Sequence, residues 1–534
     1  MRPNDLLANA AFAIAMSTFG RRAHDRLLAL AQNPEAAQTA ALRSILEANA
    51  TTEQGKRLGI GTISNADAYR KAVPIHDYED LRDQIARQIE TGDAILAPET
   101  PIMYARSSGT TGAAKYIPVT PATLVQMRQS QRAMAYVQHK TLRAFSGKVV
   151  GLGGAISEES LAGGMPAGAT TGLIYQTMPR FMRAKYVVPP EVFAIGNYDE
   201  KYLAIARLAA SEANVSAIGT ANPSTVLRLM DVIRSNLEDI AAHAAPARGR
   251  MLRRLSATSS QVTLADIWPR LRTVITWLGG GCAIAAAAVR EQLPDGAVMV
   301  DAGYVASEVR GTVVVDIENN LALPMLGDAF FEFVPAAKWE AGERETMLLH
   351  ELEVGTDYHV IITTVAGLLR YHMNDVVRVS GRIGRTPTLQ FVRKGRGVTN
   401  ITGEKLSEDQ IHGAMALLPT PPLFYIVLAD ASRSIYRAYI EIEGEAADIA
   451  VALDASLCRS NLEYDAKRMS GRLAPIEVSL LRAGAANAYH RHIVEKKNQR
   501  EAQAKVLALQ TTEECDFDFR PFELTHARLT STGR

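Results

Sequence analysis

The chain has 534 residues, 47% of them apolar and 22% charged, with a formal net charge of +1 at neutral pH. This length predicts three or four domain-sized units of ordinary globular composition. A net charge so close to zero gives no field that would attract nucleic acid or an anionic membrane surface, so neither is an expected partner. The three cysteines, Cys282, Cys458 and Cys515, are sparse and far apart, which favours a reducing, cytoplasmic location over a disulfide framework.

The first hundred residues are predicted to be helical, because residues 37–46 and 78–90 repeat apolar positions at helical spacing. The apolar stretch at residues 6–19 follows Arg2 and has features of a signal peptide. However, Asp5 and Asn9 interrupt it, and a helical pattern continues beyond it, so we interpret it as a helix of the folded chain. No other stretch approaches the roughly 20 apolar residues of a membrane helix.

A loop rich in hydroxyls and glycines follows this helical region, with the sequence SSGTTGAAK at residues 107–115. Its two glycines allow the backbone to curl, so that N–H and O–H groups converge on an anion. It is not a Walker A loop, because Gly-Lys-Ser/Thr occurs nowhere in the chain. A plain surface turn has a similar composition, so both interpretations stay open on this motif alone. The candidate phosphate-binding residues are Ser107, Ser108, Gly109, Thr110, Thr111, Gly112 and Lys115.

The middle of the chain has the pattern of a parallel α/β sheet. Residues 148–175 are predicted to be a strand followed by a long irregular loop, because Ile156 stands where a dinucleotide fingerprint needs its third glycine. Residues 271–300 alternate as strand, turn, helix and strand. Tyr304, Ser307 and Glu308 then follow at the carboxyl end of the last strand, where open α/β sheets bind ligands. Glu308 is a candidate Mg²⁺ ligand, with a helix cap or a solvated acid as the alternative.

The remaining chain is predicted to be mostly β over residues 311–379, and α+β beyond Arg396. Strands are expected near residues 425–428 and 437–442, and helices at 447–464 and 496–509. Asp375, in the segment GLLRYHMND at residues 367–375, is able to accept hydrogen bonds from a ribose diol. The alternative is an ordinary turn aspartate after Asn374.

These motifs, in this order, resemble the Gretchen Hagen 3 auxin-responsive acyl acid–amido synthetases, a family of the adenylate-forming, firefly-luciferase-like superfamily, in a bacterial-type version. The resemblance covers nearly the whole chain. It is carried by SSGTTGAAKYIP at residues 107–118, YVASE at 304–308, FFEFVP at 330–335 and NITGEK at 400–405, with looser matches at Asn461, Tyr464, Arg468 and Lys505.

The resemblance implies an α/β fold with two parts. Residues 1–395 are expected to form a large adenylation domain of parallel α/β sheets plus a β-barrel-like part, and residues 396–534 a smaller, mobile α+β cap domain. The implied reaction uses ATP and Mg²⁺ to convert a carboxylic acid into an acyl-adenylate. The acyl group then passes to an amine, expected to be that of an amino acid.

The resemblance also assigns roles by position. Ser107 to Gly112 would hold the phosphates, and Tyr304, Ser307 and Glu308 would line the nucleotide and metal site. Asp375 would bind ribose. Lys405 would approach the α-phosphate, and Lys505 would enter or leave the site as the cap domain rotates. The turn containing Gly280 and Gly281 would pack near adenine, and Met165, Thr170, Thr171 and Gly172 would line part of an acyl pocket that admits an aromatic or medium-length acid.

The sequence departs from the family pattern at two places. The usual Tyr-Arg-x-Gly-Asp is YHMND here, so Asn374 must adopt the left-handed backbone conformation that glycine uses, and one polar contact is lost at His372. Near Lys505 the motif is loose, and Lys496 and Lys497 are rival candidates. Two other functions stay open: an acyl-CoA or acyl-carrier-protein ligase that shares the adenylation step, and a non-catalytic nucleotide-binding module.

Overall fold

The structure is a computed structural model that describes residues 3–107, 114–258, 261–279, 282–395, 398–420, 422, 424–486, 488–489, 492 and 508–528. The chain divides into two compact units. The first comprises Met1–Ser107 and Lys115–Arg393, and the second comprises the rest of the chain. Among the described residues, no helix is both long and apolar enough to span a membrane.

The first unit begins with helices, as predicted. Helix α3 starts at a proline behind the cap residue Asn33, whose side chain accepts a hydrogen bond from Ala36 N, and α6 starts with a capping box formed by Asp77 and Asp80. Phe12 and Met16 are buried against later parts of this unit, so one face of the apolar stretch at 6–19 packs into its core, while Ile14 and Phe19 are exposed. The helices are α1 (Pro3–Ala15), α2 (Arg21–Leu30), α3 (Pro34–Asn49), α4 (Glu53–Arg57), α5 (Ala66–Ala72) and α6 (Tyr78–Thr91).

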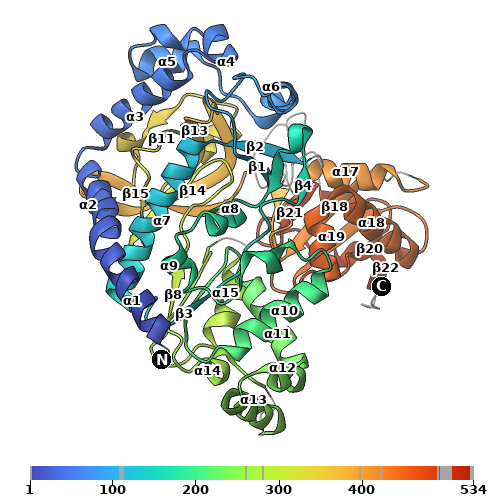
Figure 1. The fold of residues 1–534 in the computed structure, drawn as a ribbon. Helices are drawn as coiled ribbons and strands as arrows, with labels where there is room; N and C mark the ends of the chain where they lie inside the picture. Colours follow the sequence, from blue (N-terminus) through green and yellow to red (C-terminus); the bar gives the residue numbers. More distant parts are fainter. Residues whose placement is uncertain are drawn as a thin grey trace. The chain divides into compact units, whose positions relative to one another are not determined.

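The first unit contains a four-stranded parallel sheet in the order β3-β6-β7-β8. Its outer strands β3 and β8 are labelled in the lower half of Figure 1. Its strands are β3 (Lys148–Gly151), β6 (Val215–Gly219), β7 (Thr273–Thr276) and β8 (Val298–Asp301). Helix α15 (Ala283–Arg290) connects β7 to β8, which confirms the predicted strand, turn, helix and strand. Because all four strands are parallel, the residues that follow β7 and β8 emerge at the same edge.

A second small sheet, in the order β2-β1-β5-β4, carries the loop that begins after Ser107. Strands β1 (Met103–Ser107) and β2 (Lys115–Val119) are antiparallel, whereas β5 (Pro166–Gly168) runs parallel to β1 and leads into α8 (Thr170–Gln176). Beyond β3 (Lys148–Gly151), the prediction of a long irregular loop was wrong, because β4 (Glu159–Ser160), β5 and α8 lie there. The glycines allow close packing: a β-carbon at Gly172 would lie 2.4 Å from the Ile156 backbone nitrogen.

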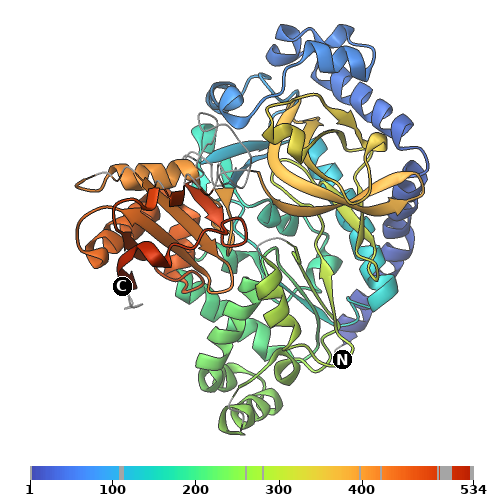
Figure 2. The same cartoon turned by 180° about the vertical axis from the view of Figure 1, so that it is seen from behind.

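The predicted β region forms an antiparallel sheet in the order β12-β11-β13-β14-β15, drawn in gold and strongly curved in both views (Figures 1 and 2). It buries Phe331, Phe333, Val360 and Val377 in the main core of this unit. Its strands are β11 (Ala329–Pro335), β12 (Met347–Leu348), β13 (Asp357–Thr364), β14 (Tyr371–Ile383) and β15 (Thr386–Lys394), and the hairpin β9 (Thr312–Asp316) and β10 (Leu321–Pro324) precedes them.

The second unit is α+β, as predicted, with a sheet in the order β21-β18-β19-β20-β22. The predicted helix at 447–464 is two helices, because Asn461 leaves the helical conformation at φ −139° and caps the second helix through Tyr464 N. Most of the helix expected at 496–509 lies outside the described residues, and Leu509 begins a strand. The elements are α17 (Glu408–Ala416), β18 (Phe424–Asp430), β19 (Ile435–Glu441), α18 (Ala446–Ser460), α19 (Leu462–Met469), β20 (Glu477–Leu481), β21 (Leu509–Thr511) and β22 (Glu523–Arg528).

Candidate active site

The two ends of the hydroxyl-rich loop lie next to each other on neighbouring strands. Ser107 ends β1 and is the register partner of Lys115, which begins β2. The Lys115 ammonium lies 5.2 Å from the centroid of the Tyr78 ring, a cation–π contact. The other predicted residues of this loop, Ser108, Gly109, Thr110, Thr111 and Gly112, lie outside the described residues, as do Gly280, Gly281 and Lys505.

Tyr304 and Asp375, 71 positions apart in the sequence, form a buried pair in the first unit. The Tyr304 hydroxyl donates to Asp375 Oδ2 at 2.8 Å, and the two residues are only 4% and 1% exposed. Burial, together with the negative charge of Asp375, raises the pKa of Tyr304 well above its ordinary value. The phenol therefore stays protonated and serves as a permanent donor that orients the Asp375 carboxylate.

Ser307 and Glu308 form the tip of a tight hairpin. Val305 and Arg310 are bridged in antiparallel fashion, and Ala306 N donates to Val309 O at 2.9 Å, which leaves two residues at the turn. The hairpin fits closely against Tyr304, because a β-carbon at residue 311, a glycine, would lie 2.4 Å from Tyr304 Cδ1. Glu308 is therefore held in place by the same short segment that carries Tyr304.

Asp375 lies inside β14 rather than in a turn, so the interpretation as a turn aspartate was wrong. The register of β13 and β14 shifts between the pairs His359–Val376 and Ile361–His372, which marks a bulge. Asn374 within this bulge has φ +51°, which confirms that asparagine replaces glycine in the left-handed conformation. The His372 side chain contacts His359, with its Nε2 3.2 Å from His359 Nδ1, and stacks on Trp339.

The predicted acyl-pocket residues lie around the start of α8. Because β5 and β1 are parallel, with Ala105 opposite Gly168, α8 begins at the same sheet edge as the hydroxyl-rich loop. Thr171 Oγ1 accepts a hydrogen bond from Gly154 N at 3.0 Å. Gly172 packs closely against the backbone of Ile156. Met165 packs against the main core of the first unit. Thr170 is the member of this group whose hydroxyl lies near a cation.

That cation is Arg310, a residue that the sequence analysis missed. Its Nη2 lies 3.5 Å from Thr170 Oγ1, and its Nε is buried with no hydrogen-bond partner among the described residues. Burial lowers the pKa of Arg310 to about 10, which still leaves the guanidinium charged at neutral pH. The sequence offered one indication of this residue: a charged side chain stands between Val309 and a glycine, just before the apolar residues of β9.

A pocket with about 350 Å³ of empty space, part of it open to solvent, brings Glu308 and Arg310 together with Asp328. Burial raises the pKa of Asp328 to about 7, against the opposing effect of Arg26. Asp328 is a second pocket residue that no motif in the sequence indicates. The lining residues are Thr123, Gln126, Met127, Glu308, Val309, Arg310, Asp328, Thr364 and Ala366.

Asp301, at the end of β8, ties together the turns that follow two neighbouring strands. Its Oδ2 accepts from Leu278 N at 3.2 Å and its Oδ1 from Gly303 N at 2.7 Å. Burial raises the pKa of this carboxyl, while the two backbone hydrogen bonds oppose the rise. Asp301 thereby fixes the chain leading into the predicted adenine turn relative to the chain leading into Tyr304.

In the second unit, Lys405 follows a fully buried carboxylate. Glu404 accepts hydrogen bonds from Ile401 N and Thr402 N, both at 2.8 Å, and from the Tyr436 hydroxyl. These contacts fix the loop that carries Lys405, whose φ is +47°. Sequence analysis missed Glu404 as a positioning residue. Lys505 and its rivals Lys496 and Lys497 lie outside the described residues, so the choice among them stays a prediction.

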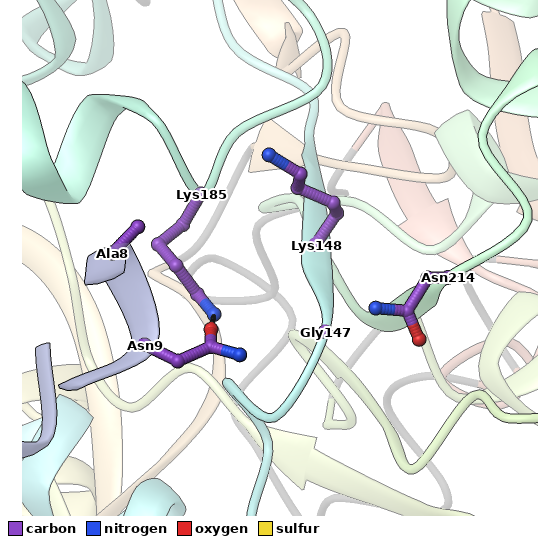
Figure 3. A pocket seen from close by; sticks show the side chains of 6 residues that line it. All are labelled: Ala8, Asn9, Gly147, Lys148, Lys185 and Asn214. Carbon is purple, nitrogen blue, oxygen red and sulfur yellow. Dashed lines mark hydrogen bonds between the residues drawn. The ribbon is translucent and has the colours of Figure 1, made fainter. Parts of the chain in front are cut away.

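Another pocket, at the amino end of β3, contains none of the predicted site residues (Figure 3). Lys185 points toward Asn9 of α1 and donates to its side-chain oxygen, while Lys148 points away and donates to Ala184 O at 2.8 Å. Ligands of parallel sheets bind at the carboxyl ends of the strands. The position of this pocket therefore favours a structural role for its two lysines.

Comparison with known proteins places most of the chain in one family. Residues 23–243 match the GH3 family N-terminal domain, residues 322–394 the GH3 family central domain, and residues 415–514 the GH3 family C-terminal domain. The Arabidopsis thaliana indole-3-acetic acid-amido synthetase GH3.2 is 24% identical, over 72% of this chain and 78% of that protein. The rice (Oryza sativa subsp. japonica) jasmonoyl–L-amino acid synthetase GH3.5 is also 24% identical, over 83% and 87%.

Solved structures share the fold over nearly the whole chain. The AtGH3.15 acyl acid amido synthetase, in complex with 2,4-DB, superposes with a TM-score of 0.65 at 20% identity, over 96% of this chain and 98% of that one. A 2-hydroxyisobutyryl-CoA ligase in its thioesterification state superposes with a TM-score of 0.51 at 14% identity, over 92% and 90%. The match of three consecutive domains over most of the sequence shows that the chain belongs to the GH3 family.

Proposed function

We propose that this chain activates a carboxylic acid with ATP as an acyl-adenylate and transfers the acyl group to the amine of an amino acid. The observation that carries the proposal is the hairpin that presents Glu308 beside the buried Tyr304–Asp375 pair, in a chain of the GH3 family. The two sequence relatives named above are an indole-3-acetic acid-amido synthetase and a jasmonoyl–L-amino acid synthetase, and these names support an amine rather than another acceptor.

The residues present fit a magnesium–nucleotide complex. Mg²⁺ is usually held by one or two carboxylates together with substrate phosphates, so the single carboxylate of Glu308 at the hairpin tip is a sufficient protein ligand. Bound Mg²⁺ would neutralise phosphate charge. Ser107 to Gly112, with Lys115 and Ser307, would donate to phosphate oxygens. Asp375, oriented by Tyr304, would accept from the ribose hydroxyls, and Gly280 and Gly281 would pack near adenine.

Adenylation removes the two obstacles to amide formation, since a carboxylate is anionic and has no leaving group. A cation beside the α-phosphate stabilises the charge that develops there, and Lys405 is our candidate for that contact. Lys505 would act when the second unit changes position, and the cap would exclude water from the anhydride. The division into an adenylation domain at residues 1–395 and a cap domain at 396–534 is part of this proposal, as is residence in the cytoplasm.

The test begins with hydroxamate trapping on the purified chain, using ATP, Mg²⁺ and a panel of carboxylic acids. We expect AMP, pyrophosphate and a hydroxamate with at least one acid. If no acid gives AMP or pyrophosphate, the chain is a nucleotide-binding module instead. With an accepted acid, mass spectrometry after incubation with amino acids or coenzyme A then separates an amide from a thioester. A thioester without any amide would overturn the proposed acceptor.

A further inference from the structure

Arg310 is a half-buried cation whose Nε is buried, and the proposed mechanism does not use it. It lies two residues beyond Glu308 on the second arm of the hairpin, and its guanidinium extends toward α8, where Nη2 is 3.5 Å from Thr170 Oγ1. A contact of this length is a weak hydrogen bond. Nε is buried and makes no hydrogen bond among the described residues. The guanidinium thus has at least one buried N–H group, at Nε, for which the described part of the protein supplies no acceptor.

The Nε atoms of Arg106, Arg183 and Arg228 also lack a partner among the described residues, but each of these guanidinium groups has a carboxylate or carbonyl partner elsewhere. Two arginines of the same unit that are buried have such partners as well. Arg370 forms an ion pair with Glu332 at 2.9 Å, and Arg248 donates to Ala210 O at 2.8 Å and to Ile267 O at 2.9 Å. Arg310 forms no ion pair within the described residues, although Glu308 and Asp328 line the same pocket. Burying a guanidinium without a counter-charge is costly, whereas an anionic ligand would supply that counter-charge.

The surroundings of Arg310 indicate which ligand would bring this anion. Thr170 belongs to the predicted acyl pocket, and Glu308 marks the metal and phosphate side of the hairpin. The reacting carboxylate must be free to attack phosphorus, and a guanidinium that held it equally in the ground and transition states would lower KM without raising kcat. A second anionic group of the same acid has no such constraint. A hydrogen-bond donor with a fixed position, away from the carboxylate that reacts, would hold this second anionic group best.

We propose that Arg310, together with the Thr170 hydroxyl, binds a second oxyanion of the acyl acid, so that the preferred substrates are dicarboxylic acids or acids with a comparable anionic group. This inference rests on the proposed function and specifies its substrate class. The guanidinium would donate two parallel hydrogen bonds to the non-reacting carboxylate, and the Thr170 hydroxyl would donate a third. The aromatic or medium-length acid that the sequence analysis expects the pocket to admit would then carry a second anionic group.

The test compares α,ω-dicarboxylic acids of four to eight carbons with monocarboxylic acids of the same lengths. In wild type, we expect kcat/KM for adenylation to favour one or more dicarboxylic acids. Arg310→Met keeps the length of the side chain but removes its charge, and should lower kcat/KM for those acids at least about tenfold. Monocarboxylic acids should be unaffected. Arg310→Lys should recover part of the loss, and Arg378→Met, which removes an exposed arginine from β14, should change neither class of acid.

Thermal unfolding supplies a readout that does not depend on turnover. The preferred dicarboxylic acid should raise the melting temperature of wild type and of Arg378→Met, but not that of Arg310→Met. Equal losses for both classes of acid would assign Arg310 to the reacting carboxylate, and a rise confined to the KM for ATP would assign it to phosphate; either result overturns the inference. If wild type adenylates no acid, the proposed function fails, and melting shifts measured with each dicarboxylic acid of the series still decide whether Arg310 binds a dicarboxylate.

Discussion

Lys405 has a φ angle of +47°, a conformation that side chains with a β-carbon adopt infrequently. Such strain persists only where surrounding contacts determine the backbone. Here Glu404 anchors the loop before Lys405, and Asn461 Nδ2 donates to Glu404 O at 2.9 Å. Burial alone would raise the pKa of Glu463, but the positive charges of Lys467 and, to a smaller extent, Lys405 lower this pKa below its ordinary value. The backbone at Lys405 is therefore fixed, and the Lys405 side chain lies near the negative charge of Glu463. A fixed backbone is what a lysine needs if it is to contact one particular atom of a ligand.

Replacing Lys405 with alanine should slow adenylation at least roughly tenfold, the loss of one transition-state contact. Alanine also has a β-carbon, so the strained backbone is penalised similarly and the fold should survive. The measurement is the rate of pyrophosphate release with saturating acid and ATP. Lys467→Ala is the matched control, because it removes a lysine of the same unit that pairs with Glu463 at 3.0 Å. A folded Lys405→Ala protein that releases pyrophosphate at the wild-type rate would exclude this role.

At the scale of single residues, the sequence indicated which side chains could bind a nucleotide better than it indicated which of them would lie next to each other. Tyr304 and Asp375 were selected from separate motifs, and the structure brings them within 2.8 Å. Arg310 was missed because its significance depends on its surroundings. An arginine in a hairpin is ordinary in a sequence, and only the structure shows that, within the described part of the chain, no carboxylate forms an ion pair with it, although Glu308 and Asp328 line the same pocket. Glu404 and Asp301 were missed for a related reason, since both act by accepting backbone hydrogen bonds that no side-chain motif encodes.

Among the elements, β14 shows how one bulge positions the side chain of a candidate site residue, Asp375. The bulge between the pairs formed by His372 and Val376 turns the strand at Asn374, whose φ is +51°. Asp375, the next residue, thereby meets the Tyr304 hydroxyl while the rest of the strand keeps its pairing with β13. The substitution of asparagine for the family glycine is tolerated because asparagine enters the left-handed region more readily than other non-glycine residues.

The bulge predicts opposite results for two substitutions. Asn374→Gly should keep the KM for ATP within about twofold of wild type, because glycine adopts φ +51° without strain. Asn374→Val should lower stability by about 1–2 kcal/mol and raise the KM for ATP, since a β-branched residue resists this conformation and shifts Asp375. Thermal unfolding and initial rates at varied ATP test both variants. If valine behaves like glycine, the left-handed conformation is not what positions Asp375.

The spacing of apolar residues predicted the long helices and strands correctly. It failed in segments whose secondary structure depends on contacts with distant parts of the chain. The helices at α3 and α6 and the sequence β7–α15–β8 follow directly from apolar spacing. The segment after β3 was predicted as loop because glycine is a poor former of both helices and strands. Its glycines instead serve close packing, as at Gly172. The predicted helix at 447–464 was divided because Asn461 is a better cap than helix interior, and its side chain satisfies Tyr464 N.

For the molecule as a whole, the order of motifs predicted the family and the fold, whereas the electrostatics of the core could not be predicted. Asp328 is the clearest case. Its backbone oxygen accepts from Gln126 Nε2 at 2.9 Å, which connects α7 (Pro121–Leu142) to the segment before β11. Its side-chain Oδ2 is buried without a hydrogen-bond partner among the described residues. Nothing in the sequence near residue 328 reveals that burial.

The raised pKa of Asp328 makes part of the stability of the protein depend on pH. The unfolded carboxyl has an ordinary pKa of 3.8, and burial raises the folded value to about 7. A folded state with the higher pKa binds its proton more tightly than the unfolded state does. This contribution is therefore fully present below pH 3.8 and is lost as the pH rises through about 7. Above that, the folded protein carries a buried charge that the unfolded chain does not.

Asp328→Asn should therefore stabilise the protein at pH 8 and have little effect at about pH 3.5, below the unfolded pKa of 3.8. The expected gain at pH 8 is on the order of a few kcal/mol, because each unit of pKa shift corresponds to about 1.4 kcal/mol. Urea unfolding of wild type and variant at both pH values measures the difference. Asp316→Asn is the control with the opposite sign, since Asn319 lowers the pKa of Asp316, so its removal should give no gain at pH 8. A difference between Asp328→Asn and wild type that is equal at the two pH values would show that the Asp328 carboxyl is not the titrating group.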